Sequence, residues 1–524
     1  GDEIRVAQGL YRPGFTDTDP NIIPDREASF LLPQGVGVYG GFVGLGQGDP
    51  NYGQPDLFPT VLSGDLLGND QPDFAGYDDN CRHVVTAVGV DAQTVLDGFV
   101  ITGGHCQGQE TNPDSLRVRG GGMLNDNADP TIRRCRFVRN TGWYDGAMLN
   151  INGSDPVVVD CRFLSNQVTG SAAGVRNRNN SRPTFINCVF SGNHAGERGG
   201  AVYDDFSSAV HLVNCTLVGN SAGDRGGAIH ADQQGRPSLT NCVVWGNTDS
   251  TGHSEAAQIA VAGGAAVVNY SCVEGWTGVL GGVGNVGDDP LLMNPAGLDG
   301  LSGTEDDDLR LSGDSPCIDA GVNSAVTADH DLAGNPRIVG MTVDMGAYEY
   351  KGPTGLVAHW TLDERSGPWA HDELGRADGA LVGNRRWRPY EGRVGGALDL
   401  DGLGDFVDCG TGSLFNVRDA VTVAAWFQVR RFDRSYQAIV TKGDSAFRLQ
   451  RYSNTSVLEF ACTGVDVPGT TWSNIWGTTP VDDGQWHHAA GVYDGQRMYL
   501  YVDGELDASS EATGRLNLND YPCL

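Results

Sequence analysis

The 524-residue sequence has almost no lysine: only Lys351 and Lys442 occur, and none precedes position 351. The chain has 35 lysine and arginine residues and 66 aspartate and glutamate residues, which gives a formal net charge of −31. Because so acidic a chain repels the phosphates of nucleic acids and the head groups of anionic lipids, neither is an expected partner. No apolar run reaches the ~18 residues that a membrane-spanning helix needs.

Cysteine is also sparse, and helical patterning is weak. Twelve cysteines in 524 residues are too few for a scaffold built on disulfides. Glycine, in contrast, is abundant, with 76 residues. The chain starts at Gly1 rather than at methionine, so we expect any export signal to have been removed, and its absence does not identify the compartment.

Five of the cysteines mark an internal repeat, because they follow one another at intervals of 26, 27, 27 and 27 residues. An asparagine stands five residues after each of them. The cysteines are Cys135, Cys161, Cys188, Cys215 and Cys242, and the asparagines are Asn140, Asn166, Asn193, Asn220 and Asn247. A fixed period of roughly 20 to 50 residues indicates stacked supersecondary units.

Each repeat contains short alternating runs without a helical pattern. In one of them, Ile186, Cys188 and Phe190 are expected on one face of a strand, and Asn187 and Val189 on the other. Units of about 27 residues with two or three short strands predict a right-handed parallel β-helix, with coils about 4.8 Å apart. The predicted fold class is therefore all-β, with this β-helix in residues 1–283; residues 1–119 form its less regular opening coils.

Positions that recur in every coil become ladders along the axis of a β-helix. We expect the cysteines to form a buried column of free thiols, because Cβ atoms at the strand spacing are too far apart for a disulfide. A straight column also lacks the tetrahedral geometry of a zinc site, so the thiols act as small apolar groups. The asparagines are expected to form an amide ladder at a turn. A second row comprises Asn125, Asn150, Asn177 and Asp204.

The repeat weakens after Cys272, and residues 284–350 are rich in glycine and aspartate. Residues 315–321 read SPCIDAG and residues 344–350 read DMGAYEY. With the repeats, this segment resembles pectin-lyase-like β-helix proteins of bacterial surfaces, in which such stretches close the solenoid ahead of cell-anchoring signals. The resemblance implies a secreted or cell-surface bacterial protein, with residues 284–350 as a cap over the strand edges at the open end.

The sequence changes character after a short linker at residues 351–355. Tryptophan becomes common, and alternating strands separated by Asp-Gly turns predict an antiparallel β-sandwich in residues 356–524. Residues 358–364, AHWTLDE, and 484–495, GQWHHAAGVYDG, resemble the laminin-G-like, concanavalin-type jelly roll. The family commonly binds glycans or partner proteins, so extracellular glycans or surface proteins are the implied partners.

By comparison with that family, the closing strands of the jelly roll are missing. In the strand Met498–Val502, alternation puts Met498, Leu500 and Val502 on one face and Tyr499 and Tyr501 on the other. The strand would then be an edge whose apolar face needs a cover. We expect either a longer native chain or a neighbouring copy that completes the sheet and builds an assembly. Cys523, without an obvious partner in the chain, could join two copies.

The metal prediction is limited to calcium, and no organic cofactor is expected. The jelly-roll family commonly carries one calcium ion, and the resemblance makes Asp363 and Asp372 candidate ligands. Carboxylates of the solenoid cap could supply further oxygen ligands. These are Asp299, Asp306, Asp307, Asp308, Asp329 and Asp331. Solvated acidic turns are the alternative interpretation.

An enzyme is the alternative to a binding protein, because β-helices of this kind often host polysaccharide lyases and glycoside hydrolases on one lateral face. A lyase needs a base and a hydrolase a carboxylate pair. The absence of lysine before position 351 removes one common base. Asp204, Asp205 and His230, on adjacent coils, are the only group that we would test for catalysis, although polar corners are normal in solenoids.

The sequence therefore predicts a secreted or cell-surface structural or adhesive protein, in which a β-helical stalk presents a glycan- or protein-binding lectin-like domain. An extracellular polysaccharide lyase or glycoside hydrolase acting on the lateral face is the other hypothesis. Turnover of a polysaccharide, lost in Asp204→Ala or His230→Ala, would favour the enzyme. Binding without turnover favours the adhesive protein.

The sequence also predicts one disulfide, between Cys272 and Cys317, if the protein resides in an oxidising compartment. The bond would close a loop of about 45 residues and stabilise the fold by roughly 4 kcal/mol on the chain-entropy model. Thiol counting in denaturant should give two more free thiols after reduction than before it. An unchanged count would show that the bond is absent, and a disulfide within the ladder of five cysteines would contradict the derived register.

Overall fold

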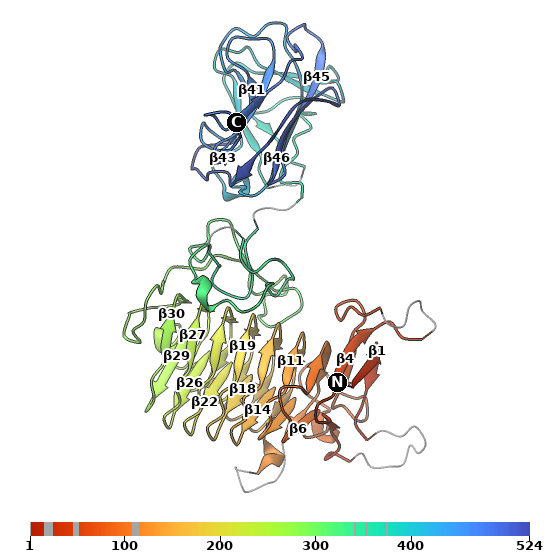
Figure 1. Ribbon diagram of the computed structural model, residues 1–524, viewed down its shortest axis with the longest axis vertical. Coiled ribbons are helices and arrows are strands. Elements are labelled where there is room, and N and C mark those ends of the chain that lie inside the picture. The colour runs from red at the N-terminus through yellow and green to blue at the C-terminus, as the bar shows by residue number, and fades with distance from the viewer. Residues whose placement is uncertain are drawn as a thin grey trace. The chain divides into compact units, whose positions relative to one another are not determined.

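The computed structural model describes residues 2–14, 25–45, 52–106, 115–339, 342–351, 355–373 and 376–524. The chain divides into two compact units, residues 1–350 and 351–524. Most of the predicted linker at 351–355 lies outside the described residues. Parallel strands build the first unit and antiparallel strands the second (Figure 1), which confirms the predicted fold class.

Four parallel sheets, here called A to D, run along the first unit. Sheet A comprises β1 (Glu3–Ala7), β4 (Gly37–Phe42), β7 (Val95–Asp97), β11 (Thr131–Arg133), β15 (Val157–Val159), β19 (Thr184–Ile186), β23 (His211–Val213), β27 (Ser238–Thr240) and β30 (Val267–Asn269). Sheet B comprises β2 (Gly9–Tyr11), β5 (Thr60–Ser63), β8 (Phe99–Thr102), β12 (Arg136–Val138), β16 (Arg162–Leu164), β20 (Val189–Ser191), β24 (Thr216–Val218), β28 (Val243–Trp245) and β31 (Cys272–Val273).

Sheet C comprises β3 (Phe30–Leu31), β6 (Val85–Val88), β10 (Met123–Asp126), β14 (Met148–Ile151), β18 (Val175–Asn177), β22 (Val202–Asp204), β26 (Ile229–Asp232) and β29 (Ile259–Ala262). Sheet D comprises β9 (His105–Cys106), β13 (Thr141–Gly142), β17 (Gln167–Val168), β21 (His194–Ala195) and β25 (Ser221–Ala222). The unit also contains η1 (Tyr77–Asp79), η2 (Leu116–Val118), α1 (Glu255–Gln258), β32 (Leu292–Asn294), β33 (Asp308–Leu311) and η3 (Asn323–Ala325). Among the described residues, no helix has the length and apolar character to cross a membrane.

Each regular coil passes through sheets C, A, B and D in turn, and left-handed backbone conformations form its corners. The residue before each ladder cysteine has φ between +48° and +56°, as at Asn187. This corner separates β19 from β20 and resets the alternation, so Phe185 is buried while Ile186 is only half-buried. The prediction that Ile186 faces the core beside Cys188 was therefore wrong, because it treated two short strands as one.

The core of the β-helix is built from stacked copies of the same side chain. The five ladder cysteines are fully buried and have free thiols. Beside them, the rings of Phe137, Phe163 and Phe190 stack nearly parallel, with centroids 4.8 and 4.7 Å apart. These separations equal the strand spacing, so the coils bring the rings into contact without a change of register.

The five ladder asparagines lie fully buried at the corner after sheet B. The side-chain amide of Asn193 donates to the carbonyl oxygen of Phe163 and to Oδ1 of Asn220, each at 2.8 Å. Its Oδ1 accepts from the side-chain nitrogen of Asn166 at 2.9 Å. Asn247 is the last asparagine of the row, and it donates to Oε1 of Gln258, a residue of α1, at 2.8 Å.

The second row lies on the inward face of sheet C. Asn125 donates to Asn150, Asn150 to Asn177, and Asn177 to Oδ1 of Asp204, over 2.7 to 2.8 Å. Asp204 is fully buried, and its other oxygen accepts the backbone N–H of Val210 at 2.9 Å. These bonds satisfy polar groups inside the solenoid that water cannot reach.

Residues 284–350, here called the flank segment, lie mainly along the side of the solenoid, whereas the sequence suggested a cap over its end. Only the start of the segment pairs with the final coil, where Val286 bridges Cys272. The remainder packs on the outward face of sheet B, with Leu309 and Ala347 against Leu164 and other side chains of that face. Corner asparagines hold it there; the side chains of Asn187, Asn214 and Asn241 donate to the carbonyl oxygens of His330, Asp344 and Val322.

The second unit is an antiparallel sandwich. Sheet E comprises β39 (Val421–Gln428), β45 (Trp486–Tyr493), β46 (Arg497–Val502) and β47 (Glu505–Glu511), and sheet F comprises β40 (Ala438–Thr441), β41 (Phe447–Arg451), β42 (Leu458–Cys462) and β44 (Asn474–Trp476). Smaller sheets pair β34 (Trp369–Ala370) and β38 (Phe406–Asp408) with β35 (Gly379–Val382), β36 (Arg386–Arg388) with β37 (Ala397–Asp399), and β43 (Val465–Asp466) with β48 (Thr513–Gly514). A 3₁₀ turn, η4 (Ser413–Phe415), precedes β39.

The predicted open edge at Met498–Val502 is not present. β47 pairs with β46, and the apolar face formed by Met498, Leu500 and Val502 is buried in the core of the unit. The prediction failed because Glu505–Glu511 is too polar to be recognised as a strand. Cys523 is also buried, and its backbone oxygen accepts the N–H of Cys409 at 2.9 Å, so this cysteine lies inside the sandwich beside another cysteine.

We expect Asn193→Ala to destabilise the β-helix by about 3 kcal/mol or more, because it leaves several buried polar groups of neighbouring coils without partners. Asn69→Ala is the matched control, since the Asn69 side chain is exposed, and its effect should stay within ~0.5 kcal/mol. Equilibrium unfolding in urea measures both values. Equal effects of the two substitutions would show that the buried ladder does not stabilise the fold.

Candidate functional site

The outward face of sheet C carries a buried polar network. Arg176, Tyr203 and His230 occupy equivalent positions on β18, β22 and β26 and are register partners. Although they point away from the core, they are only 6%, 5% and 1% exposed. The guanidinium of Arg176 lies 4.6 Å from the centroid of the Tyr203 ring, which meets the His230 ring edge-on at 5.0 Å. Such contacts fix the three side chains in one column.

Two buried carboxylates neutralise the arginine of this column. Arg176 donates to Asp205 at 2.5 Å and to Asp145 at 3.3 Å, and Asp145 also binds Arg119 at 3.0 Å. Burial raises the pKa of Asp205 even though Arg176 opposes the shift. The pKa of Arg176 is raised by its two carboxylates despite its burial. The arrangement is a buried ion network in which the charges are paired. Removing one partner would destabilise the fold strongly, because the other charge would stay buried and uncompensated.

The histidine at the end of the column is uncharged at neutral pH. Burial lowers the pKa of His230 to about 4, although Asp232 opposes the shift. Oδ2 of Asp232 lies 3.8 Å from Nε2 of His230 and accepts the hydroxyl proton of Tyr203 at 2.8 Å. Neither ring nitrogen of His230 has a hydrogen-bond partner among the described residues. A neutral imidazole is a competent base, but a side chain that is 1% exposed needs an opening motion to meet a polymer.

The three candidate catalytic residues from the sequence are not all brought together. Asp205 and His230 both belong to the outward network, whereas Asp204 points into the core and ends the second polar row. Asp204 is the last residue of β22 and faces inward, whereas Asp205, the next residue along the chain, lies on the outward side. Tyr203 and Asp232 had also been recognised in the sequence as neighbours of His230 on adjacent coils. The sequence missed Arg176; the register of the repeat, extended by one coil, would have placed it beside Tyr203.

The carboxylates proposed as calcium ligands mostly accept hydrogen bonds from nearby turns. Asp363 accepts the N–H of Gly396 at 2.5 Å, and Asp372 accepts that of His359 at 2.8 Å. In the flank segment, the carboxylates of Asp299, Asp306, Asp307 and Asp331 accept backbone N–H groups of nearby turns. The carboxylate of Asp308 forms an ion pair with Arg310. At Asp329 the backbone oxygen accepts the backbone N–H of Arg337. The described residues contain no group of three or more His, Cys, Asp or Glu side chains suited to a metal ion. Calcium stays a prediction.

The two cysteines of the predicted disulfide are neighbours. Cys272 and Cys317 are fully buried in one apolar cluster and are free thiols here. The pKa of Cys272 is raised well above its usual value. The interaction with Cys317 is the largest cause of this shift, and burial is the second. The flank segment brings them together, so oxidation would fasten this segment to the last coil; the disulfide itself stays a prediction.

The sandwich presents a second candidate surface, the face of sheet E that points away from its core. Along β45 and β46 every second residue is buried and the others are half-buried. β39 alternates between less and more exposed residues, and Val423 is its buried residue. Trp426 pairs with His488 across two strands, and Ala490 pairs with Tyr501 across the next two. Alternation places all four on the same face, where small Ala490 leaves the neighbouring rings accessible.

This aromatic face is partly exposed and flanked by polar groups. Trp426 is 46% exposed, and its ring lies 5.1 Å from that of His488. Arg393 lies 5.3 Å from the centroid of the Trp426 ring. Tyr499 and Tyr501 stack at 6.2 Å with an interplanar angle of 20°. The sequence had placed the two tyrosines opposite the buried residues of β46, and the same period in β39 would have added Trp426.

Comparisons with known proteins agree with this two-part architecture. Residues 86–244 match the family model of the right-handed β-helix region, and residues 401–524 match that of the concanavalin A-like lectin/glucanases superfamily. None of the curated proteins matches the chain.

Several solved structures are similar to the chain at low sequence identity. The binding domain of Paraclostridial Mosquitocidal Protein 1 is 14% identical, with 29% of this chain and 40% of that chain covered and a TM-score of 0.24. Domain 4 of AbnA, a GH43 extracellular arabinanase from Geobacillus stearothermophilus solved with arabinotriose, is 15% identical, with 32% and 80% covered and a TM-score of 0.25. The enzymatically active domain of tailspike protein 2 from bacteriophage CBA120 is 11% identical, with 95% and 77% covered and a TM-score of 0.22.

The first unit is thus a right-handed parallel β-helix, defined by its stacked parallel sheets and by the family model that matches residues 86–244. The second unit is a concanavalin A-like sandwich of the lectin and glucanase type, matched over residues 401–524. The chain combines a β-helical solenoid with a concanavalin A-like sandwich.

The buried Asp204 leads to a prediction about pH. Burial raises the pKa of Asp204 to about 7, whereas the unfolded side chain loses its proton near the ordinary aspartate pKa of 3.8. Between these values the folded state binds the extra proton, so the stability that Asp204 contributes is complete at low pH and is lost as the pH rises through about 7.

Asp204→Asn cannot titrate here and serves as the reference. The free energy of unfolding of the wild type, relative to this variant, should fall by at most ~1.4 kcal/mol per pH unit between about pH 4 and pH 7. Urea unfolding at a series of pH values measures the difference. Parallel stability profiles for the two proteins would contradict a raised pKa at this position.

Proposed function

We propose that the protein is a secreted or cell-surface adhesive protein whose sandwich binds a glycan while the β-helix serves as a stiff stalk. The observation that carries the proposal is the partly exposed aromatic face of sheet E, with Trp426, His488, Tyr499 and Tyr501 in adjacent positions. Exposed aromatic side chains bordered by polar groups are typical of ligand-binding surfaces.

The chemistry of this face suits a sugar. The flat side of an indole or phenol ring packs against the C–H groups of a pyranose, and neighbouring polar groups bond to its hydroxyls. Gln428 lies on the same face as Trp426, and Arg393 borders it. The match to the concanavalin A-like lectin and glucanase superfamily includes all the strands of sheet E and supports this assignment.

Location and partners follow from the same proposal. The resemblance of residues 284–350 to bacterial surface proteins supports an extracellular place, where glycans and surface proteins are the accessible partners. Calcium remains part of the proposal because the sandwich resembles calcium-carrying jelly rolls. Binding should therefore be measured with Ca²⁺ and with a chelator.

The test is binding of the full chain to a panel of plant, algal and bacterial polysaccharides. We expect Trp426→Ala to weaken binding about tenfold or more, as is typical for truncation of an aromatic anchor. Trp472→Ala is the matched control, because Trp472 is 75% exposed but lies outside sheet E. Unchanged binding by the Trp426 variant, or an equal loss in both variants, would refute the aromatic face as the binding surface.

The same panel tests the enzyme hypothesis, which the neutral His230 and its carboxylate neighbours keep open. Release of reducing ends or of unsaturated uronates, lost in His230→Ala but not in Trp426→Ala, would make the outward network of sheet C a catalytic site. Binding without turnover would leave the network with a structural role.

A further inference from the structure

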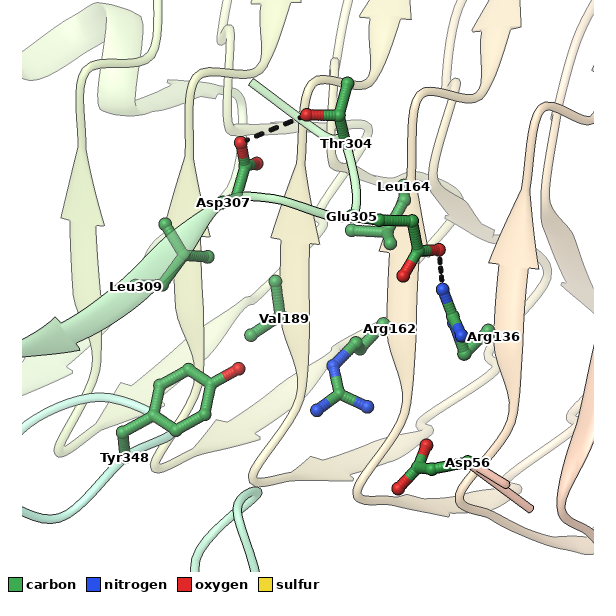
Figure 2. A pocket seen from close by; sticks show the side chains of 10 residues that line it. All are labelled: Asp56, Arg136, Arg162, Leu164, Val189, Thr304, Glu305, Asp307, Leu309 and Tyr348. Carbon is green, nitrogen blue, oxygen red and sulfur yellow. Dashed lines mark hydrogen bonds and ion pairs between the residues drawn. The ribbon is translucent and has the colours of Figure 1, made fainter. Parts of the chain in front are cut away.

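A cavity of about 230 Å³ lies between the outward face of sheet B and the flank segment that crosses it (Figure 2). Arg136, Arg162 and Val189 form its solenoid side, and Glu305, Asp307 and Tyr348 belong to the flank segment. The cavity is distinct from both candidate surfaces described above, because those lie on sheets C and E.

Two arginines stand side by side on the solenoid wall of this cavity. Arg136 and Arg162 are register partners on the adjacent strands β12 and β16, so their backbones are one strand spacing apart. Like charges in such a position destabilise a sheet. The pKa of Arg136 is lowered by burial and by the charge of Arg162. The two arginines are adjacent although the protein has a net charge of −31 and many carboxylates.

Only one of the two guanidinium groups forms an ion pair with the described residues of the cavity. Glu305 forms an ion pair with Arg136 (Figure 2). Among the described residues, no carboxylate lies within ion-pair distance of Arg162. Asp307 does not fill this role, because it accepts bonds from Gly303 N–H and the Ser191 hydroxyl, at 2.6 and 3.2 Å.

The remaining groups of the cavity surround the guanidinium of Arg162, which interacts with the Tyr348 hydroxyl but has no ion pair with the described residues there. The Tyr348 hydroxyl points into the cavity in Figure 2. Burial raises its pKa although Arg162 opposes the shift, so the hydroxyl keeps its proton at neutral pH. Thr304 and exposed Asp56 complete the polar wall. Leu164, Val189 and Leu309 supply an apolar side.

We propose that this cavity binds the oxyanion of a small hydroxylated ligand, a carboxylate or a sulfate, through Arg162 and Tyr348. A planar guanidinium matches two oxygens of such an anion, and the charge relieves the repulsion between the arginines. The cavity is smaller than the ~300 to 1,000 Å³ of sites for drug-sized ligands, so the ligand is of the size of one sugar ring or less. Bound there, it joins the solenoid to the flank segment.

The test is calorimetric titration of the full chain with sodium sulfate, with D-glucuronate and with D-glucose at constant ionic strength. Saturable binding of glucuronate, but not of glucose, is expected for a sugar carboxylate; tighter binding of sulfate identifies an inorganic anion or a sulfate ester. Arg162→Gln should weaken anion binding about tenfold or more. Tyr348→Phe, which keeps the ring, should weaken it several-fold.

Arg182→Gln is the matched control, because Arg182 is exposed on the same unit and does not line the cavity. Trp426→Ala should leave anion binding unchanged, which separates this site from the proposed glycan surface. Without ligand, Arg162→Gln should melt at the same temperature as the wild type or higher, because it removes a like-charge contact.

Absence of saturable binding for both anions would overturn the proposal. Equal binding by the wild type and Arg162→Gln would overturn it as well, and so would an equal loss in Arg182→Gln. If Arg162→Gln fails to fold, the Tyr348→Phe titration decides, since unaltered affinity in that variant would also remove the site.

Discussion

The buried asparagine row is the interaction on which the solenoid depends. At each corner the chain turns sharply and leaves backbone carbonyls inside the protein, away from water. The side chain of Asn193 satisfies one of them in the preceding coil and bonds to the next asparagine of the row. An interior group that lacks such a partner costs more than the bond itself contributes. The row therefore holds the coils that carry it in one register.

Strict register has a consequence on the outside of the solenoid. Side chains at equivalent positions of adjacent coils become neighbours one strand spacing apart, whatever their chemistry. Arg176 meets the Tyr203 ring and is neutralised by carboxylates that project from the corners. Arg136 and Arg162 meet each other, and the flank segment supplies a carboxylate to only one of them. Repetition stabilises the core, because identical apolar or amide side chains pack well against one another. On the surface, each pair of neighbouring side chains needs its own compensating contacts.

The limits of sequence interpretation follow from the same contrast. The period of about 27 residues predicted the stacked coils and both polar rows because a fixed spacing encodes position directly. It placed Ile186 wrongly because left-handed Asn187 divides the run into two strands. The flank position of residues 284–350 depends on docking to Asn187, Asn214 and Asn241, which are distant in sequence. The aromatic face of the sandwich was within reach, since alternation had already separated Tyr499 and Tyr501 from the buried residues.

The two polar rows share a direction and an ending. In both, each amide donates to the residue of the following coil, so the side-chain dipoles align and strengthen one another. The last group must then accept without donating onward to another coil, and a carboxylate meets that requirement. Asp204 ends one row directly, and Glu274 ends the other by accepting from Gln258 at 3.1 Å. The aspartate at position 204, which stands where the repeat would have asparagine, is thus explained by the polarity of the row, and this role requires no catalytic function.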